Sequence, residues 1–348
     1  MKKILSPSTI MFVAFFIGIH HVSAQDKKFK AGCIAFYNTE NFYDTINDPK
    51  TNDDDYTPDG RLNWTSQRYW TKVEHISTVI SQIGDELVKG GPVIIGLAEV
   101  ETQQVLEDLV NAPALKPSKY GIVHYKSPDK KGIDVALLYQ KDHFVLVNSK
   151  AVPLHIKDKP PTRDQLVVYG KFDGDPMYFI VNHWPARYNG EKNTSPMRNA
   201  AADLTKSIVD SIQKIDSTAK IVVMGDLNDN PTNESVVKHL KVKDNIKETG
   251  NKDLFNPMYK LYKRDAIGTI DNGNNWDLFD QIMVTGTLLG DDKSTYKFYQ
   301  ACIFNKKTFM FQQDGPYKGY PLRTYVGGAY MGGYSDHLPA YIFLVKQK

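Results

Sequence analysis

Apolar and polar positions alternate along the chain with two distinct periods. Apolar residues recur at three- and four-residue steps through 65–87 and again through 196–215. This spacing places them on one side of an α-helix, so we predict a long amphipathic helix over each range. Shorter apolar runs predict β-strands. These runs span 31–37, 93–98, 121–125, 134–139, 144–154, 166–172, 177–182, 221–224, 279–285, 296–304 and 340–345.

The order of these elements suggests two similar halves. In each half a long helix precedes a strand without polar alternation, at 93–98 and at 221–224, as expected of strands buried on both faces. An acid follows each strand, Glu99 in one half and Asp226 in the other. Two mixed sheets packed face to face, with helices outside, would bury every apolar face. We therefore predict an α/β fold in which 25–348 form a single domain, with 305–333 as a long surface loop.

The first 24 residues have the pattern of an export signal. Lys2 and Lys3 precede an apolar stretch over 10–19, and Val22-Ser23-Ala24 resembles a cleavage site. The apolar stretch is short for a transmembrane helix, and no Cys follows the cleavage site. We predict a signal peptide over 1–24, export to the periplasm or the exterior, and no stable membrane anchor. A retained anchor is the alternative.

Composition narrows the function classes only slightly. The chain has 348 residues, 41% hydrophobic and 24% charged, which is typical of a globular protein. Two of its 43 basic residues lie in 1–24, so the remainder is nearly balanced against 40 acidic residues. This balance argues mildly against broad DNA binding but allows a nuclease with a local positive patch. Cys33 and Cys302 lack metal-ligand spacing and fit either a disulfide or two free thiols.

Ligand-type side chains follow several predicted strands. Glu99 comes directly after 94–98, where a carboxylate suits Mg²⁺, although an acid at the start of a helix fits equally well. Asp226 and Asn228 follow 221–225. An Asx turn is the alternative there, but four Asp or Asn within five positions exceed the needs of a turn. We therefore favour a site at which Asp226 binds metal or orients water and Asn228 contacts a phosphate oxygen.

Two histidines occupy similar positions. His183 ends the strand at 177–182 and precedes Arg187, a good phosphate ligand. General acid work and a purely structural role are equally plausible for this histidine. Asp336 and His337 stand at the start of the last strand, and Asp280 is a candidate partner for the ring of His337. The alternative for Asp280 is a solvent-facing acid on its strand.

Other hydrolase classes lack their signatures in this sequence. No Gly-Lys-Ser/Thr phosphate loop, Gly-x-Ser-x-Gly elbow or His-Glu-x-x-His helix is present. NTPase, serine hydrolase and zinc protease functions are therefore disfavoured.

Seven motifs in order give the chain a recognisable family pattern. They are Phe36-Tyr37-Asn38-Thr39-Glu40-Asn41, Leu97-Ala98-Glu99-Val100, Gly132-Ile133-Asp134-Val135-Ala136, Val181-Asn182-His183-Trp184-Pro185-Ala186-Arg187, Gly225-Asp226-Leu227-Asn228-Asp229, Phe279-Asp280-Gln281-Ile282 and Ser335-Asp336-His337-Leu338-Pro339. With these motifs the chain resembles the endonuclease/exonuclease/phosphatase family, which includes pancreatic-type deoxyribonuclease, apurinic endonucleases, bacterial sphingomyelinases and inositol-polyphosphate phosphatases. Each motif is moderately specific, and the ordered set is highly specific.

The resemblance implies a four-layer α/β sandwich and a role for each matching residue. It implies that a metal, Mg²⁺ with Mn²⁺ or Ca²⁺ as alternatives, is held by Asn38, Glu99 and Asp336. It implies that catalysis is carried by His183, Asp226, Asn228, Asp280 and His337. The residues it assigns to phosphate neutralisation or support are Arg187, Arg198 and Asp134.

Three functions remain open at this point. We favour an exported, monomeric, metal-dependent phosphodiesterase or nuclease that hydrolyses phosphodiester bonds by in-line attack of water. The second is a phosphatase or sphingomyelinase-like enzyme on lipid or sugar phosphates, and the third is a non-catalytic binding protein on the same scaffold. Basic and aromatic residues mix within 317–325, which suits nucleic acid, a membrane surface or a sugar.

Overall fold

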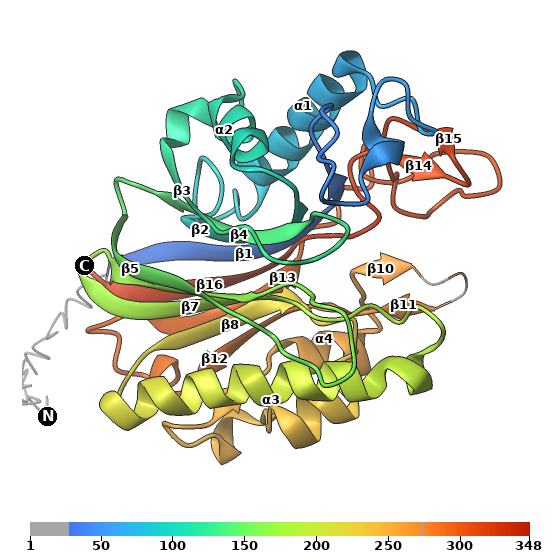
Figure 1. Ribbon diagram of the computed structural model, residues 1–348. Coiled ribbons are helices and arrows are strands. Elements are labelled where there is room, and N and C mark those ends of the chain that lie inside the picture. The colour runs from blue at the N-terminus through green and yellow to red at the C-terminus, as the bar shows by residue number, and fades with distance from the viewer. Residues whose placement is uncertain (1–27, 272, 274) are drawn as a thin grey trace, which may run out of the picture.

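Two six-stranded mixed β-sheets lie face to face in the computed structural model of the chain, which describes residues 28–271, 273 and 275–348 (Figure 1). Sheet 1 has the order β13 (Lys297–Ile303), β16 (Ala340–Gln347), β1 (Phe29–Phe42), β2 (Ile94–Val100), β4 (Asp134–Gln140) and β3 (Tyr120–His124). Sheet 2 has the order β5 (Phe144–Val152), β6 (Gln165–Phe172), β7 (Asp175–His183), β8 (Ile221–Asp226), β12 (Asp280–Thr285) and β9 (Leu254–Phe255). The predicted signal peptide, 1–24, lies outside the described residues.

The two halves of the chain repeat one arrangement. β1 and β2 run parallel and are joined through α1 (Ser66–Gln82), and β7 and β8 run parallel and are joined through α3 (Glu191–Ile215). The other pairings within the two large sheets are antiparallel. Each parallel pair therefore directs two carboxyl ends to one edge of its sheet, and the two similar halves expected from the sequence are present.

Three apolar layers hold the four structural layers together. Side chains of β1, β4 and β16 meet those of β6, β7 and β8 between the two sheets. α1 and α2 (Gln103–Asn111) cover the outer face of sheet 1, whereas α3 covers that of sheet 2 (Figure 1). The predicted four-layer α/β sandwich is confirmed.

Both long helices differ from their predicted limits. α1 ends at Gln82 instead of residue 87, because Ile83 is extended and Gly84 has a φ of 76°. α3 begins at Glu191, five residues before the predicted start, and contains Pro196. A proline cannot donate to the carbonyl four residues earlier. The hydroxyl of Ser195 donates to that carbonyl, Lys192 O, at 3.2 Å, so the helix continues through the proline.

The segment 305–333, which we call the late segment, is anchored more firmly than a surface loop. Met310 and Phe311 are buried against the core between sheet 1 and its helices. The buried ammonium of Lys72, on α1, donates to Thr324 Oγ1 at 2.7 Å. The segment also forms the hairpin of β14 (Tyr325–Val326) and β15 (Ala329–Tyr330). The segment is largely irregular and exposed, as predicted for a surface loop, but several of its aromatic side chains pack inward.

Several short elements had no clear signal in the sequence. The longest is α4 (Met258–Asp265), which packs against β12. The short hairpin of β10 (Ile270–Asp271) and β11 (Trp276–Asp277) follows it. A π-helical turn covers Ser235–His239, and 3₁₀ turns cover Asp54–Tyr56, Lys116–Ser118, Ile246–Glu248 and Gly286–Leu288. Such elements are too short for hydrophobic periodicity to reveal them.

β1 and β16 are the first and last strands of sheet 1 along the chain, and they lie next to each other as an antiparallel pair. Phe29 lies opposite Gln347, and Phe36 lies opposite Ala340 at the other end of the pair. Both cysteines are free thiols, because β16 separates Cys33 on β1 from Cys302 on β13. Across the residues that the structure describes, no helix combines the length and apolarity needed to cross a bilayer.

Candidate active site

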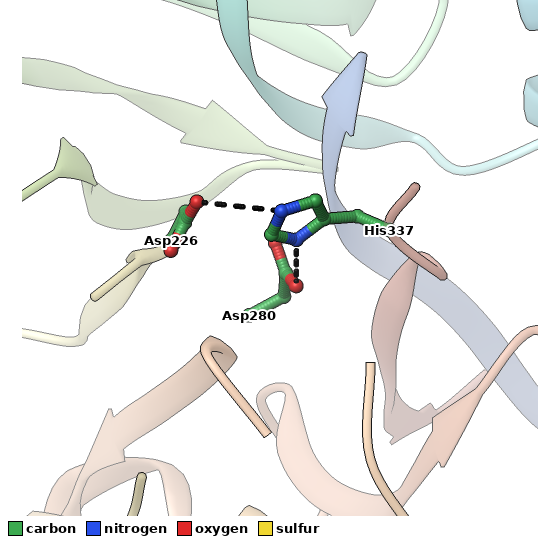
Figure 2. A group of neighbouring side chains, drawn as sticks. All are labelled: Asp226, Asp280 and His337. Carbon is green, nitrogen blue, oxygen red and sulfur yellow. Dashed lines mark hydrogen bonds and ion pairs between the residues drawn. The ribbon is translucent and has the colours of Figure 1, made fainter. Parts of the chain in front are cut away.

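Polar residues from both sheets meet at the edge where the parallel strands end. Figure 2 shows three of them, Asp226, Asp280 and His337, with their side chains directed toward one another. We call the full set the polar cluster; its members are Asn38, Glu99, His183, Asp226, Asp280 and His337. All except Glu99 are almost completely buried. The strand-end positions singled out in the sequence therefore converge in space.

Asn38 joins the carboxylates of the two sheets. Its Nδ2 donates to Asp226 Oδ2 at 2.9 Å and to Glu99 Oε1 at 3.2 Å. Its Oδ1 accepts a hydrogen bond from the backbone N–H of Glu40 at 2.9 Å. This third bond fixes the orientation of the amide and turns the nitrogen, instead of the oxygen, toward the carboxylates.

Left-handed backbone conformations surround these carboxylates. Glu40, Asn41, Glu99 and Asn228 have φ values of 52°, 50°, 61° and 49°. Such values are uncommon for residues other than glycine and cost about 1–3 kcal/mol at constrained positions. In return, the N–H of Asn41 donates to Glu99 Oε2 at 2.8 Å, and the N–H of Asn228 donates to Asp226 Oδ1 at 2.9 Å. The backbone is thus bent to hold both acids in place.

His337 is paired with the fully buried carboxylate of Asp280. The distance from its Nδ1 to Asp280 Oδ2 is 2.7 Å, and its Nε2 faces Asp226 Oδ2 at 3.9 Å (Figure 2). Burial lowers the pKa of His337, but attraction to Asp280, Asp336 and Asp226 outweighs it and raises this pKa well above its usual value. His337 therefore carries a positive charge at neutral pH and offers Nε2–H as a donor.

Asp226 lies between His337, whose pKa is raised, and His183, whose pKa is lowered. Burial raises its pKa to about 6, although the charge on His337 lowers it. On the other side, His183 Nε2 is 3.7 Å from Asp226 Oδ2 and 3.9 Å from Glu99 Oε1. Burial, assisted by the charges of Arg163 and His337, lowers the pKa of His183 well below its usual value, so this ring is neutral. One charged and one neutral imidazole therefore flank a single carboxylate.

Asn228 and the two predicted phosphate arginines form a neighbouring structural network. Asn228 Nδ2 donates to the carbonyl of Trp184 at 3.0 Å, and its own carbonyl accepts from Arg187 Nε at 2.7 Å. Arg187 and the fully buried Arg198 both form ion pairs with Asp229 Oδ1, at 3.0 and 2.8 Å. The structure brings both arginines to Asp229, so the phosphate contact predicted for them stays a prediction.

Asp134 and Asp336 are also held by partners. Asp134 accepts hydrogen bonds from Ser127 N and Oγ at 2.8 and 2.6 Å, and its Oδ2 is 3.1 Å from His124 Nε2. It thereby fixes the loop before β4. Asp336 forms an ion pair with Arg323, and its Oδ1 is 3.9 Å from His337 Nε2. Asp336 is thus beside the polar cluster, whereas Asp134, at the start of β4, contacts Ser127 and His124 instead of a member of the cluster.

The donor atoms of the polar cluster suit a hard divalent cation. Asp226, Asp280 and His337 bring one ligand-type atom each to within 4.8 Å of the others, although the charged ring of His337 would have to lose a proton before it could bind a cation. Asp280 Oδ1 is buried and has no hydrogen-bond partner among the described residues. Carboxylate oxygens are the preferred ligands of Mg²⁺, and a nearby cation relieves the cost of burying them. Glu99 adds a further carboxylate, while Asn38 as placed is a donor to the acids.

Two positioning residues carried no assignment in the sequence. Ser335 Oγ donates to the carbonyl of Asn38 at 2.8 Å and accepts from the N–H of His337 at 3.1 Å. Thr269 Oγ1 accepts from the N–H of Asp280 at 3.2 Å. Ser335 stands beside the Asp-His pair and was identifiable from that position. Thr269 lies in an irregular segment without any pattern, and only the fold brings it to Asp280.

Comparison with known proteins identifies the family of this fold and site. The model of the endonuclease/exonuclease/phosphatase family matches residues 33–346, which is most of the chain. The chain belongs to the endonuclease/exonuclease/phosphatase family. Enzymes of this family use divalent metals, and the chain, as a member, is a hydrolase of phosphate esters. A search of curated proteins found no match.

Solved structures of other family members share the fold. Zebrafish (D. rerio) TDP2 complexed with single-strand DNA product is 13% identical, with a TM-score of 0.55, and the match covers 90% of this chain and 98% of that chain. A mannosyl-6-phosphatase from Bacteroides thetaiotaomicron is 18% identical, with a TM-score of 0.53 and coverages of 90% and 99%. Truncated Caenorhabditis elegans TDP2 is 15% identical, with a TM-score of 0.55 and coverages of 90% and 97%. At these identities the likeness shows the family fold alone.

Proposed function

We propose that this family member is an exported, metal-dependent phosphodiesterase. The observation that carries the proposal is the placement of Asp226. One of its oxygens is held by Asn38 Nδ2 at 2.9 Å and flanked by His183 and His337, while the other accepts the N–H of Asn228. An acid with a pKa of about 6 between a neutral and a charged imidazole is suited to accept a proton from water.

Each member of the polar cluster has a role in this reaction. Asp226 orients the attacking water and takes its proton. His337, charged through Asp280, donates from Nε2 to a non-bridging phosphate oxygen, and His183 contacts the phosphate or the leaving oxygen. Glu99 and Asp336, positioned by Asn38 and Arg323, would hold the cation. When bound, Mg²⁺ would polarise the phosphoryl group and stabilise the leaving oxygen as a Lewis acid.

The charge of the site favours a diester over a monoester. A diester phosphate carries one negative charge, whereas a monoester approaches two at neutral pH. Arg187, Arg198 and Arg163 are engaged with Asp229 or Asp129, so the protein's own positive charge at the polar cluster comes from His337. This supports a singly charged substrate. A phosphatase acting on sugar or lipid phosphates is the second candidate. The mannosyl-6-phosphatase, which has the same fold, is an example of such an enzyme.

The experiment compares hydrolysis of bis-p-nitrophenyl phosphate and p-nitrophenyl phosphate with Mg²⁺, Mn²⁺, Ca²⁺ or EDTA, beside a plasmid-nicking assay. We expect metal-dependent cleavage of the diester, lost in Asp226→Ala and in His337→Ala while both variants stay folded by circular dichroism. Nicking would identify a nuclease. Preference for the monoester would favour the phosphatase. Inactivity of the folded protein with every metal and substrate would favour a non-catalytic binding protein.

Export is the second part of the proposal and rests on the sequence of residues 1–24 alone. N-terminal sequencing of the protein recovered from the culture medium or periplasm tests it. We expect the mature chain to begin at Gln25, and an intact Met1 on a protein confined to the cytoplasm would contradict export.

A further inference from the structure

A concave site is lined in part by Leu338, the residue that follows His337 of the polar cluster. It has a volume of about 400 Å³ and lies between the segment before β10, the β10–β11 hairpin and the late segment; we call it the Trp276 pocket. Trp276, Phe311 and Leu338 provide its apolar wall, and Trp276 and Phe311 have their ring centroids 6.2 Å apart. Lys307 and Lys318 are exposed at its mouth.

The Trp276 pocket and the polar cluster share one piece of backbone. Leu338, in the wall of the pocket, follows His337 directly and donates from its N–H to the carbonyl of Thr269 at 2.7 Å. Ile270 pairs with His337 in an isolated antiparallel bridge. Tyr320, which follows Gly319 of the pocket lining, donates from its hydroxyl to the carbonyl of Gly273 at 2.7 Å and so ties the late segment to the hairpin. A group bound in this pocket would therefore lie on a fixed wall, one residue from His337.

The lining of the pocket selects the chemistry of its ligand. An aromatic side chain offers a flat, apolar surface on which a nucleobase or a sugar ring stacks. The described residues that line the pocket include two lysines and neither an Asp nor a Glu. Lysine ammonium groups are compact charges that bind phosphate. The combination fits a ring that carries a negative charge of its own.

We infer that the Trp276 pocket is a substrate subsite for a ring bearing a second phosphate, beyond the phosphate that is cleaved. The ring packs on Trp276, and the second phosphate is contacted by Lys307 and Lys318. This inference rests on the proposed function, because it assumes that the scissile phosphate binds at His337 and Asp226. A nucleotide and a phosphorylated sugar share this chemistry, and the experiment distinguishes them.

Tryptophan fluorescence measures binding without requiring turnover. In Mg²⁺ buffer, thymidine 3′,5′-bisphosphate is compared with thymidine 5′-monophosphate, and glucose 1,6-bisphosphate with glucose 1-phosphate. We expect a bisphosphate of at least one ring type to bind about fivefold tighter than its monophosphate, since two exposed ion pairs are added. The pair with the larger difference identifies the ring. Trp276→Phe should alter the fluorescence response, whereas the exposed Trp70→Phe should not.

Charge variants separate the pocket from the metal site. In Lys307→Gln/Lys318→Gln, both bisphosphates should bind no tighter than their monophosphates, and Lys119→Gln, on the distant turn before β3, should retain the wild-type difference. Hydrolysis of bis-p-nitrophenyl phosphate, which has no second phosphate, should be unchanged in the double variant. Equal affinity for bisphosphate and monophosphate in the wild type, or a preference unaffected by the double variant, would overturn the inference. If the wild-type protein does not hydrolyse the diester but still binds bisphosphate more tightly than monophosphate through Lys307 and Lys318, the proposed function is refuted and the pocket is not.

Discussion

Asn38 of sheet 1 donates a hydrogen bond of 2.9 Å to Asp226 of sheet 2. The same amide nitrogen donates to Glu99 at 3.2 Å, so one side chain fixes the separation of two acids that would otherwise repel each other. The polar cluster is therefore a property of the interface between the sheets. Its geometry depends on how accurately the two halves of the chain pack.

Replacement of Asn38 tests this bridge. Asn38→Ala leaves the carboxylates of Asp226 and Glu99 without their shared donor, and we expect the free energy of unfolding to fall by about 1–3 kcal/mol. Misplacement of the acids should lower kcat by about 10²-fold. Urea unfolding and diester hydrolysis measure the two effects. Asn111→Ala, which removes an exposed amide on α2, is the control and should change neither; a similar loss in both variants would contradict the bridging role.

Asp280→Asn tests the origin of the charge on His337. The variant keeps the shape of the side chain but removes the negative charge 2.7 Å from His337 Nδ1. We expect the pKa of His337, followed by NMR of its ring protons, to fall toward or below its usual value, and kcat at neutral pH to decrease by about 10³-fold or more. The exposed pair of His239 and Asp203 offers a matched control, Asp203→Asn. An unchanged pKa of His337 in Asp280→Asn would refute the assignment.

Lys72 forms a buried ion pair with Glu40 of β1 and anchors the late segment through a hydrogen bond to Thr324. Its Nζ is 3.6 Å from Glu40 Oε2, and it donates to Thr324 and to the carbonyl of Tyr334. Removing one partner of a buried pair leaves an uncompensated charge, so Lys72→Met should destabilise the protein by about 3 kcal/mol. Lys119→Met, in an exposed pair with Asp142, should cost less than about 1 kcal/mol. If Lys72→Met and Lys119→Met lower the free energy of unfolding equally in denaturant, burial does not make the Lys72 pair more important for stability.

The stability of metal-free protein should depend on pH through Asp226. Its folded pKa of about 6 exceeds the usual value near 3.9, so between these values the folded state binds the proton and the unfolded state does not. The free energy of unfolding should therefore fall as pH rises from about 4 to 6, by up to about 3 kcal/mol from this group. His337, with a raised pKa, adds a fall in the same direction above pH 6.5.

Denaturant unfolding in EDTA at pH 4.5, 6 and 7.5 measures this dependence. Asp226→Asn should lack the part of the fall below pH 6, since the amide does not ionise. Saturating Mg²⁺, held at Glu99 and Asp336, should raise the stability above pH 6, because a cation near Asp226 favours the ionised form of its carboxylate. If the free energy of unfolding changes between pH 4.5 and 6 by the same amount in the wild type and in Asp226→Asn, the raised pKa of Asp226 is contradicted.

The sequence predicted the layers of the fold because long, regular elements carry their own pattern. The buried strands ending at Glu99 and Asp226 were predictable from uninterrupted apolar runs, and the helices from their period. The limits of the helices were less accessible. Pro196 suggested a start, but the hydroxyl of Ser195 allows the helix to continue, and the late segment looked polar although Met310 and Phe311 turn inward.

The order of the strands brings the residues of the polar cluster together. It does not determine which acids pair with the arginines. Parallel strands in each half bring Asn38, Glu99, His183 and Asp226 to one edge, and the sequence showed these side chains at strand ends without showing that the strands run parallel. The partners of the arginines depend on side-chain packing between distant segments. Arg198 pairs with Asp229. Arg323 pairs with Glu40, 283 residues earlier in the chain, and with Asp336, 13 residues later. No local pattern in a single sequence encodes such pairs.

The pairing of β1 with β16 gives the molecule two functionally different poles. The backbone N–H of Lys348 donates to the carbonyl of Lys28 at 2.8 Å, at the end of the strand pair remote from Asn38. Ten residues separate Lys28 from Asn38 along the chain, which in extended conformation is roughly 33 Å. A short peptide linker joining 28 to 348 would therefore suit a circular permutant with new ends in a distal loop. Tethering the protein to a bead or a cell wall through either of these residues would likewise leave the pole that carries the polar cluster facing solution.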